Sequence, residues 1–593
     1  KNINFSTKAS KEKIRAAFYV DWDPQSFFSL EKNIDKLNMV MPEWFFIDPN
    51  TDTVYTKIDT AALGLMKSKN VNILPIINNT NSKNGVGEFD GKILHRIIHD
   101  EQKKERLIND IVRLLKQNKL QGINIDFEDF IEKSDEPITK FQKELFQKLH
   151  SNGLLVTQDI MPDDDDFDVK ALANYNDYII LMAYDEHFAT SKPGSISSQQ
   201  FIEKVLDDAA KDIPSEKIIL AFAGYGYDWQ DGVEATNLTY QQALVNAKQY
   251  NSVIDFDNDT YNNHYVYKDP KQINHDVYFT DAASNFNTIR FADQYGTAGT
   301  ALWRLGSEDD RLWDFYGRNL SNNSLSKNPF DYNKLKNVNT PVESPDYIGD
   351  GEVLNVITTP QPGKINLEVD SAEGIITEQN YLQLPTKYVI KKYGNVHRQV
   401  ILTFDDGPDA EYTPKILDIL KKEKIPATFF IVGSEAESNL PILKRIFEEG
   451  HEIGNHTFTH PNMAAISTER AATEMETTRL LIEAVTGKST ILFRAPFNAD
   501  SEPRKDEELK PIALSKKKNY YTIGESIDPN DWEPSVTADS IFYRTILQYE
   551  KNPNKGIILF HDAGGNRQAT VDALPRIIKY FKDKNIQFTT VAS

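Results

Sequence analysis

The sequence predicts an α/β protein with a complete (β/α)8 (TIM) barrel in its N-terminal half, a short β-rich linker region and an incomplete (β/α)7-type barrel at its C-terminus. Two observations predict this class. Short apolar segments alternate with longer amphipathic segments from Arg15 to Leu305, and the alternation resumes at Gln399. In addition, a chain of 593 residues is too long for one hydrophobic core.

Eight apolar segments in the N-terminal half are candidate strands. They are Ala16–Val20, Met39–Ile47, Val71–Ile77, Gly122–Phe127, Leu154–Met161, Tyr178–Tyr184, Ile218–Ala223 and Gly299–Leu305. Helical periodicity fills several of the gaps, for example Arg106–Lys116. The long polar and aromatic gap between Ala223 and Gly299 indicates an inserted subdomain. Eight such units predict a barrel domain over residues 12–318.

After Gly317 the chain is rich in Asn, Ser and Pro, which is typical of a linker. Alternating residues between Val353 and Ile390 predict a few short antiparallel strands. We therefore expect a linker with short strands over residues 319–395 and a second domain over 396–593. In that domain a helix is expected from about Pro414 to Lys424, with Thr413 as its N-cap.

Composition limits the possible functions. The formal net charge is −21, which argues against a nucleic-acid partner. The chain has no cysteine, so disulfides and thiolate metal sites are excluded, and any metal must bind to His, Asp or Glu. No apolar run is long enough to span a membrane. The chain begins with Lys, so we expect a processed or excised piece whose targeting segment has been removed.

Five short motifs in the C-terminal part carry polar residues, most of them at the ends of predicted strands. They are Asp405-Asp406-Gly407-Pro408, Asn455-His456-Thr457-Phe458-Thr459-His460, Phe493-Arg494-Ala495-Pro496-Phe497, Asp528-Pro529-Asn530-Asp531-Trp532 and Leu559-Phe560-His561-Asp562. Adjacent carboxylates repel each other unless a cation or proton lies between them. Two histidines at i and i+4 share a face if the segment is helical, as two metal ligands require. Each motif alone is weak, but five in this order are not expected by chance.

With these motifs the segment closely resembles the polysaccharide deacetylase family (carbohydrate esterase family 4). The resemblance implies that Asp406, His456 and His460 bind a divalent metal, most simply zinc. It implies that Asp405 is the general base and that His561 protonates the departing sugar amine.

The same resemblance assigns supporting roles. Arg494 would hold Asp405, and Asp531 would orient His561 and raise its pKa. The backbone N–H of Phe497 would stabilise the oxyanion, while Trp532 and Leu559 would wall the pocket. The family's usual Tyr-Gly is Phe497-Asn498 here, which we expect to be tolerated, because only the backbone N–H is needed and Asn tolerates left-handed conformations.

Polar residues also gather on the fourth strand of the N-terminal barrel. In a strand, Asn124, Asp126 and Glu128 point to one face, with Glu128 at the carboxyl end where barrel enzymes place their active sites. Burying such acids without a function would be costly. Tyr184 and Asp185 end the sixth strand, and Trp303 lies in the eighth.

Together these residues resemble glycoside hydrolase family 18, and most closely a subgroup of N-acetylglucosaminidases associated with spore peptidoglycan. The resemblance implies that Glu128 is the general acid and that the substrate's own acetamido group is the nucleophile. Asp126, Tyr184 and Asp185 would position that group, above a floor formed by Trp303. Two acids of the family's DxxDxDxE pattern are replaced, by Gln121 and Asn124. The barrel is therefore either a second hydrolase or a catalytically silent carbohydrate-binding platform.

The prediction is an extracellular or cell-surface bacterial protein that deacetylates a β-linked N-acetylglucosamine polysaccharide. A monomer is expected. A pair of adhesin or scaffold domains without turnover is a third alternative, which the intact set of acids and histidines in the C-terminal motifs disfavours.

Overall fold

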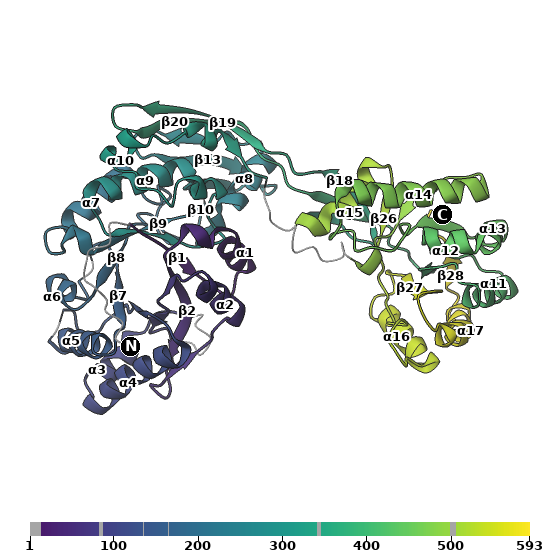
Figure 1. Cartoon of the computed structure of the whole chain (residues 1–593), viewed down its shortest axis with the longest axis horizontal. Coiled ribbons are helices and arrows are strands. Elements are labelled where there is room, and N and C mark those ends of the chain that lie inside the picture. The colour runs from purple at the N-terminus through teal and green to yellow at the C-terminus, as the bar shows by residue number, and fades with distance from the viewer. Residues whose placement is uncertain are drawn as a thin grey trace. The chain divides into compact units, whose positions relative to one another are not determined.

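A computed structural model describes residues 13–81, 87–134, 136–163, 165–340, 345–498 and 506–592. The chain forms two compact units (Figure 1). The first unit comprises residues 1–340 and 362–385, and the second comprises residues 341–361 and 386–593. Each unit has its own hydrophobic core.

The first unit contains a closed barrel of eight parallel strands, as predicted. In chain order the strands are β1 (Ile14–Tyr19), β2 (Met39–Ile47), β5 (Ile76–Asn78), β6 (Gly122–Asp126), β7 (Leu155–Ile160), β8 (Tyr178–Met182), β9 (Ile218–Ala223) and β15 (Gly299–Trp303). Neighbours in the sheet follow this order, and pairing of β1 with both β2 and β15 closes the barrel. The predicted third strand is divided into β4 (Asn72–Ile73) and β5, with Pro75, which has no N–H to donate, between them.

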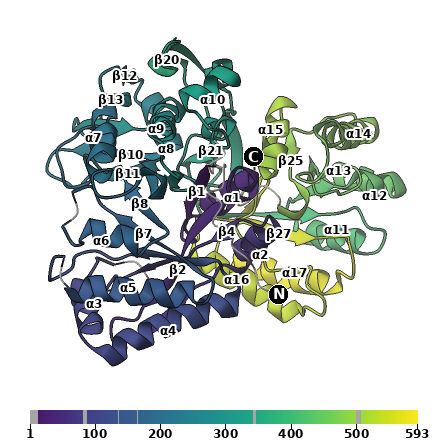
Figure 2. The same cartoon turned by 60° about the vertical axis from the view of Figure 1, so that its left-hand side comes forward.

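Helices surround the barrel (Figure 2). They are α1 (Pro24–Asn33), α2 (Thr60–Ser68), α3 (Gly91–Ile98), α4 (Glu101–Asn118), α5 (Glu136–His150), α6 (Val169–Asn174), α7 (Gln199–Ala209) and α9 (Ala282–Tyr295). The predicted helix at Arg106–Lys116 lies within α4, whose Leu107, Ile111 and Leu115 are buried. Helices α3, α4 and α5 are neighbours.

The predicted insertion is an antiparallel sheet with one helix. Its elements are β10 (Tyr225–Gln230), β11 (Thr236–Thr239), α8 (Tyr240–Gln249), β12 (Asp255–Asp257), β13 (Asn262–Lys268) and β14 (Asn274–Phe279). The aromatic residues of β13 belong mainly to its core: Tyr265 is fully buried, and Tyr267 stacks on Tyr250 with ring centroids 4.2 Å apart.

The segment 319–395, for which composition predicted a linker with short strands, is divided between the two units. Strands β16 (Asn337–Val338), β19 (Gly363–Asp370) and β20 (Ile375–Gln383) form a sheet of the first unit, whereas β17 (Asp346–Gly349), β18 (Val353–Thr358) and β21 (Val389–Tyr393) join the sheet of the second. Apolar side chains explain this, because Phe330, Leu335 and Ile376 are buried in the barrel's core. Residues 341–344 lie outside the described part of the chain.

The second unit is an incomplete barrel on a mixed sheet, in agreement with the predicted α/β class. Its parallel strands are β22 (Gln399–Asp405), β23 (Thr428–Ile431), β24 (Glu452–Asn455), β25 (Leu492–Phe493), β26 (Tyr521–Ile523), β27 (Ile557–His561) and β28 (Gln587–Thr589). Strand β18 extends the sheet antiparallel to β26. Its helices are α11 (Tyr412–Glu423), α12 (Gly433–Ser438), α13 (Leu440–Glu448), α14 (Thr468–Thr486), α15 (Asp506–Lys517), α16 (Ala538–Lys551) and α17 (Gln568–Asp583).

The predicted start of α11 was wrong by two residues. The helix begins at Tyr412, so Thr413 lies inside it rather than at its N-cap. The Thr413 hydroxyl instead donates to Asp562 Oδ2 at 2.5 Å. The Thr413 side chain thus bonds to a buried carboxyl instead of capping the helix.

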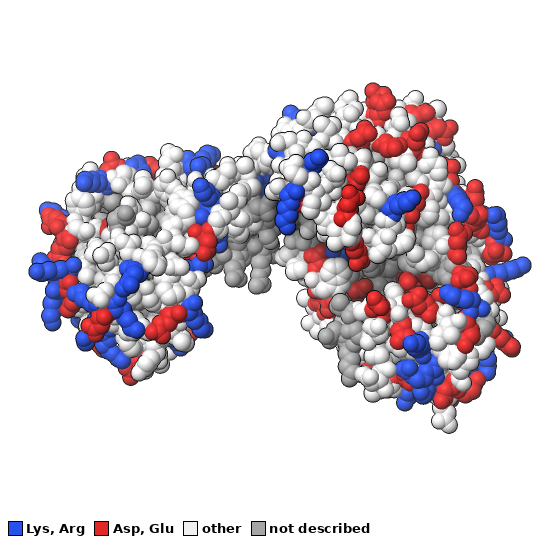
Figure 3. All heavy atoms as spheres, turned by 180° about the vertical axis from the view of Figure 1, so that it is seen from behind, with Lys and Arg blue, Asp and Glu red and all other residues white. Residues whose placement is uncertain are grey.

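On the face shown in Figure 3, acidic and basic side chains are mixed over both units. Within the described part of the chain, no helix combines the length and the apolar character needed to cross a membrane.

Candidate active sites

The five C-terminal motifs meet at one cavity of about 470 Å³. Strands β22, β24, β25 and β27 deliver most of them at their carboxyl ends, which meet at one edge of a parallel sheet. The cavity is lined by Asp405, Asp406, His456, His460, Ala495, Phe497, Asp528, Trp532, Leu559 and His561.

Asp406, His456 and His460 form a group with the composition of a metal site. Asp406 Oδ1 lies 3.0 Å from His460 Nε2 and 3.5 Å from His456 Nε2. One ligand atom from each residue lies within 4.8 Å of the others. Burial alone would raise the pKa of Asp406, but the two histidines hold it well below its usual range. His456 Nδ1 lies 2.7 Å from the carbonyl oxygen of Arg494, the outer partner that metal-binding histidines usually have. This donor set fits zinc.

The segment from His456 to His460 is not helical, contrary to the geometry considered from its spacing. It is a loop after β24, with positive φ at Thr457 and His460. The buried Glu474 of α14 shapes the loop: its Oε2 accepts from the backbone N–H groups of Phe458 and Thr459 at 3.0 and 2.7 Å. The backbone N–H groups of this loop therefore donate to a carboxylate that is distant in sequence, instead of to the carbonyl groups of a helix.

Asp405 is buried at the end of β22 and is held by an ion pair. Arg494 Nη1 donates to Asp405 Oδ1 at 2.8 Å and to Thr403 Oγ1 at 2.8 Å. The same guanidinium donates to the carbonyl oxygens of Ile523 and Gly524. With several donors satisfied, Arg494 holds one oxygen of Asp405 in a fixed position.

His561 ends β27 and pairs with the fully buried Asp531. His561 Nδ1 lies 2.7 Å from Asp531 Oδ1, and Asp531 Oδ2 accepts from the His561 backbone N–H and from Thr570. Burial alone would lower the pKa of His561, but Asp531, with Asp405 and Asp406, raises it to about 9. The imidazole is therefore positively charged at neutral pH.

Three further residues border the cavity. Phe497 and Trp532 are 66% and 51% exposed, so both can contact a bound polymer, whereas Leu559 is buried. Phe497 has a φ of 63°, a left-handed conformation that is unusual for an aromatic residue. The side chain of Asn498 lies outside the described residues.

In the first unit, acids from neighbouring strands meet at the carboxyl end of the barrel. Asn124 Nδ2 donates to Asp159 Oδ2 at 2.7 Å, and Thr157 donates to Asn124 Oδ1 at 2.6 Å. Burial, together with Asp159 and Glu43, raises the pKa of Asp126 well above its usual range. Burial and Glu128 raise the pKa of Asp159 likewise, against the hydrogen bond from Asn124.

The remaining predicted barrel residues lie beside these acids. Tyr184 is buried and stacks with Trp303, with ring centroids 6.5 Å apart. Asp185 accepts hydrogen bonds from the hydroxyls of Tyr225 and Tyr227. Burial raises the pKa of Asp185, although both tyrosines act in the opposite direction.

Comparison with known proteins gives one family for each unit. The polysaccharide deacetylase family matches residues 392–509, and glycosyl hydrolases family 18 matches residues 15–309. A Bacillus cereus protein named peptidoglycan-N-acetylglucosamine deacetylase is 35% identical over 212 residues, which cover 35% of this chain and 93% of that protein. The chain belongs to the polysaccharide deacetylase family. It is an enzyme with a family 18 domain in its N-terminal half.

Two other relatives match parts of the chain. A second Bacillus cereus protein of the same name is 37% identical over 195 residues, which cover 33% of this chain and 67% of that protein. The uncharacterized glycosylase YvbX of Bacillus subtilis is 26% identical over 306 residues, which cover 50% of this chain and 88% of that protein.

The motifs did not indicate several residues that shape the two sites of the deacetylase. Glu474 is one of them. Asp562 ends the fifth motif but was given no role: it is buried and donates its backbone N–H to the Asp405 carbonyl, and burial raises its pKa to about 7. In the barrel, Asn79 brackets Glu128, accepting from its N–H at 3.1 Å and donating to its carbonyl oxygen at 2.8 Å. Glu474 and Asn79 lie outside the motifs in sequence, so no local spacing marks them.

Glu474→Ala is expected to weaken zinc binding by about 10- to 100-fold, the usual cost of losing an outer partner of a metal site. The substitution leaves the N–H groups of Phe458 and Thr459 without their acceptor, so the loop that carries both histidines loses its shape. Competition with a fluorescent chelator measures the affinity. Glu476→Ala is the matched control, because Glu476 lies one half-turn away on α14 and pairs with Arg479 at the surface. Unchanged zinc affinity in Glu474→Ala would remove Glu474 from this role.

Asp159→Asn is expected to stabilise the barrel increasingly as pH rises. A carboxyl whose pKa is raised in the folded state contributes its full stability only below the unfolded pKa of about 3.9. As the pH rises from there to the folded pKa, the free energy of unfolding falls by up to about 1.4 kcal/mol per pH unit. The variant should therefore match the wild type near pH 4 and exceed it progressively above. Urea unfolding followed by tryptophan fluorescence reports the barrel, which holds Trp22, Trp44, Trp229, Trp303 and Trp313 of the six tryptophans. A difference that does not change with pH would contradict the raised pKa.

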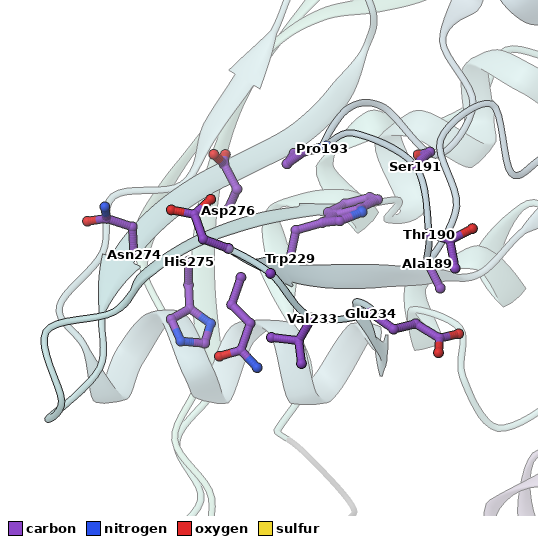
Figure 4. Close-up of a pocket in the computed structure, with 13 residues that line it drawn as sticks. Ala189, Thr190, Ser191, Pro193, Trp229, Val233, Glu234, Asn274, His275 and Asp276 are labelled. Atoms are coloured by element: carbon purple, nitrogen blue, oxygen red, sulfur yellow. The ribbon is translucent and has the colours of Figure 1, made fainter.

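A second cavity of about 400 Å³ lies in the first unit, between the loop after β8 and the inserted sheet (Figure 4). Trp229, His275 and Asp276 line it from the sheet, and Ala189 and Pro193 from the loop. Asp231 and Glu234 make its lining acidic, and the described residues that line it include no lysine or arginine. The loop that lines this cavity follows Asp185, one of the acids of the barrel, directly in the sequence.

Proposed function

We propose that the second unit removes acetyl groups from the N-acetylglucosamine residues of a β-linked cell-wall polysaccharide, in a zinc-dependent reaction at or outside the surface of a bacterium. The observation that carries this proposal is the convergence of three arrangements on one cavity. These are the metal-binding group of Asp406, His456 and His460, the Asp405–Arg494 ion pair, and the His561–Asp531 pair. The names of the Bacillus cereus relatives support peptidoglycan as the polymer.

Asp406, His456 and His460 would hold the ion. Three protein ligands leave positions for water and substrate, as in other catalytic zinc sites. A bound ion would supply Lewis-acid polarisation and would lower the pKa of water toward about 7.

Asp405 then takes a proton from the attacking water as general base, with Arg494 fixing its orientation. As the acetamide carbon becomes tetrahedral, the backbone N–H of Phe497 donates to the developing oxyanion. His561, charged at neutral pH because of Asp531, donates its proton to the departing sugar nitrogen. The exposed rings of Trp532 and Phe497, with Leu559 below, would hold the sugar chain against the cavity.

We propose that the family 18 barrel hydrolyses the same polymer, with Glu128 as general acid. Asp126, Tyr184 and Asp185 would orient the substrate's acetamido group over Trp303. The position of Asp159 favours catalysis over simple binding. Asn124 lacks the carboxyl that the family has at that position, but it hydrogen-bonds Asp159, whose raised pKa allows it to keep a proton near Asp126. A barrel that binds the polymer without cleaving it is the alternative.

Incubation with chitin oligomers, peptidoglycan and poly-N-acetylglucosamine, followed by acetate and reducing-end assays, tests both proposals. Acetate from at least one polymer supports the deacetylase. Reducing ends from an acetylated polymer support the hydrolase, and their absence with all three supports the binding barrel. Absence of acetate from every polymer would overturn the principal proposal.

A further inference from the structure

The barrel carries a second group of metal-binding side chains, far in sequence from the deacetylase motifs. His95 and His99 lie one helical turn apart at the end of α3, and Glu132 comes from the loop between β6 and α5. One ligand atom of each residue lies within 4.8 Å of the others, as in the group of Asp406, His456 and His460. These are the two such groups among the described residues.

His99 has the outer backbone partner that metal-binding histidines often use, and His95 lies directly beside the carboxylate of Glu132. His99 Nδ1 lies 2.9 Å from the His95 carbonyl oxygen, so that Nδ1 carries the proton and Nε2 the lone pair. His95 Nδ1 lies 2.6 Å from Glu132 Oε2, and the two imidazole centroids are 4.2 Å apart. In the deacetylase group the carboxylate of Asp406 also lies next to histidine nitrogens, there the Nε2 atoms of both histidines.

The elements that carry these ligands are held firmly. Residue His99 continues the helical pattern, with its N–H donating to the His95 carbonyl at 3.2 Å. At the other end of α3, a Cβ on Gly91 would lie 1.7 Å from the carbonyl oxygen of Asp129, so helix and loop are in direct contact. Asp166 fixes the loop further, accepting from the Phe130 N–H at 3.3 Å and from Lys133. The backbone that carries the ligands is therefore largely preorganised.

We propose that His95, His99 and Glu132 bind a zinc-class divalent ion that ties α3 to the loop following Glu128. Two imidazoles and one carboxylate favour zinc, cobalt or nickel over magnesium and calcium, which prefer oxygen ligands. His95 and Glu132 are 40% and 42% exposed in their side chains, so an ion can enter and water can complete its shell. The negative end of the α3 dipole also favours a cation here. Because Glu132 follows Glu128 by four residues, the ion would restrain the loop that leads away from the barrel's acids.

Zinc counted per chain after equilibrium dialysis of the whole 593-residue chain tests this inference. We expect about two ions in the wild type and about one in His95→Ala, in His99→Ala and in the double variant His456→Ala/His460→Ala, because each change removes a ligand from one group only. Combining His99→Ala with the double variant should leave none. The matched control is His150→Ala, since His150 pairs with Asp177 at 3.0 Å on the barrel surface without a second histidine.

A thermal readout keeps the test independent of ion counting. In the His456→Ala/His460→Ala background, zinc should raise the melting temperature of the barrel and magnesium should not, and addition of His99→Ala should abolish the zinc effect. A wild type that binds about one ion, lost only on changing His456 and His460, would overturn the second site and leave the deacetylase site intact. Retention of two ions in His99→Ala would equally overturn it. If His95→Ala and His99→Ala lost zinc but the His456→Ala/His460→Ala variant did not, the result would instead contradict the metal site of the deacetylase proposal.

Discussion

Asp405→Asn protein is expected to keep its zinc and to release acetate about 100- to 10,000-fold more slowly than the wild type, the range typical of a lost general base. Asn fills the same space and can still accept from Arg494, so the cavity should keep its shape. It cannot take a proton from water at neutral pH. Acetate release and zinc content measured on the same preparation separate catalysis from metal binding.

Substitutions at neighbouring residues should affect acetate release and zinc content differently. Asp406→Asn should lose both zinc and activity, because it removes a charged ligand. His561→Ala should keep zinc and lose turnover, since an amine leaves poorly when it is not protonated. Asp418→Asn, which changes an exposed carboxylate of α11 that pairs with Arg445, should change neither. Wild-type turnover in Asp405→Asn would require another base.

Glu128→Gln is expected to abolish release of reducing ends, by about 100-fold or more, while acetate release from short soluble substrates stays near the wild-type rate. Glutamine at this position cannot protonate the glycosidic oxygen. The second unit has its own cavity and core, so its reaction should not depend on Glu128. Both products are measured in one incubation.

The two activities should oppose each other at any one sugar. A substrate-assisted hydrolase needs the acetamido carbonyl of the sugar whose bond it breaks, and the deacetylase removes that group. Asp405→Asn protein should therefore release more reducing ends from an acetylated polymer than the wild type in long incubations. Equal cleavage of fully deacetylated polymer would contradict substrate assistance.

Regular alternation predicted the fold well because each barrel strand is a short, buried apolar run and the helices between them are amphipathic. All eight predicted strands of the first barrel were found, with one divided at Pro75. The segment 319–395 was less predictable. Its composition is that of a linker, yet a few apolar side chains, such as Phe330 and Leu335, fix parts of it to the barrel's core.

At the sites, local motifs identified the residues that line one cavity and two residues that hold them, Arg494 and Asp531, but they missed partners that lie outside the motifs. The i and i+4 spacing of His456 and His460 would place both side chains on one face if the segment were helical. The segment is instead a loop, held by Glu474 of α14, and the loop also brings the two histidines together. Asp159 lies on a strand next to Asn124 and meets it only because β6 and β7 pair in register. Such contacts depend on tertiary structure, which spacing along one chain does not encode.

Acetate release after chelation and after zinc is restored tests the central claim most directly. Protein freed of metal should release essentially no acetate from an N-acetylglucosamine polymer, and added zinc should restore the wild-type rate unless His456 or His460 is changed to alanine. Full acetate release by metal-free protein would contradict a deacetylase that depends on Asp406, His456 and His460.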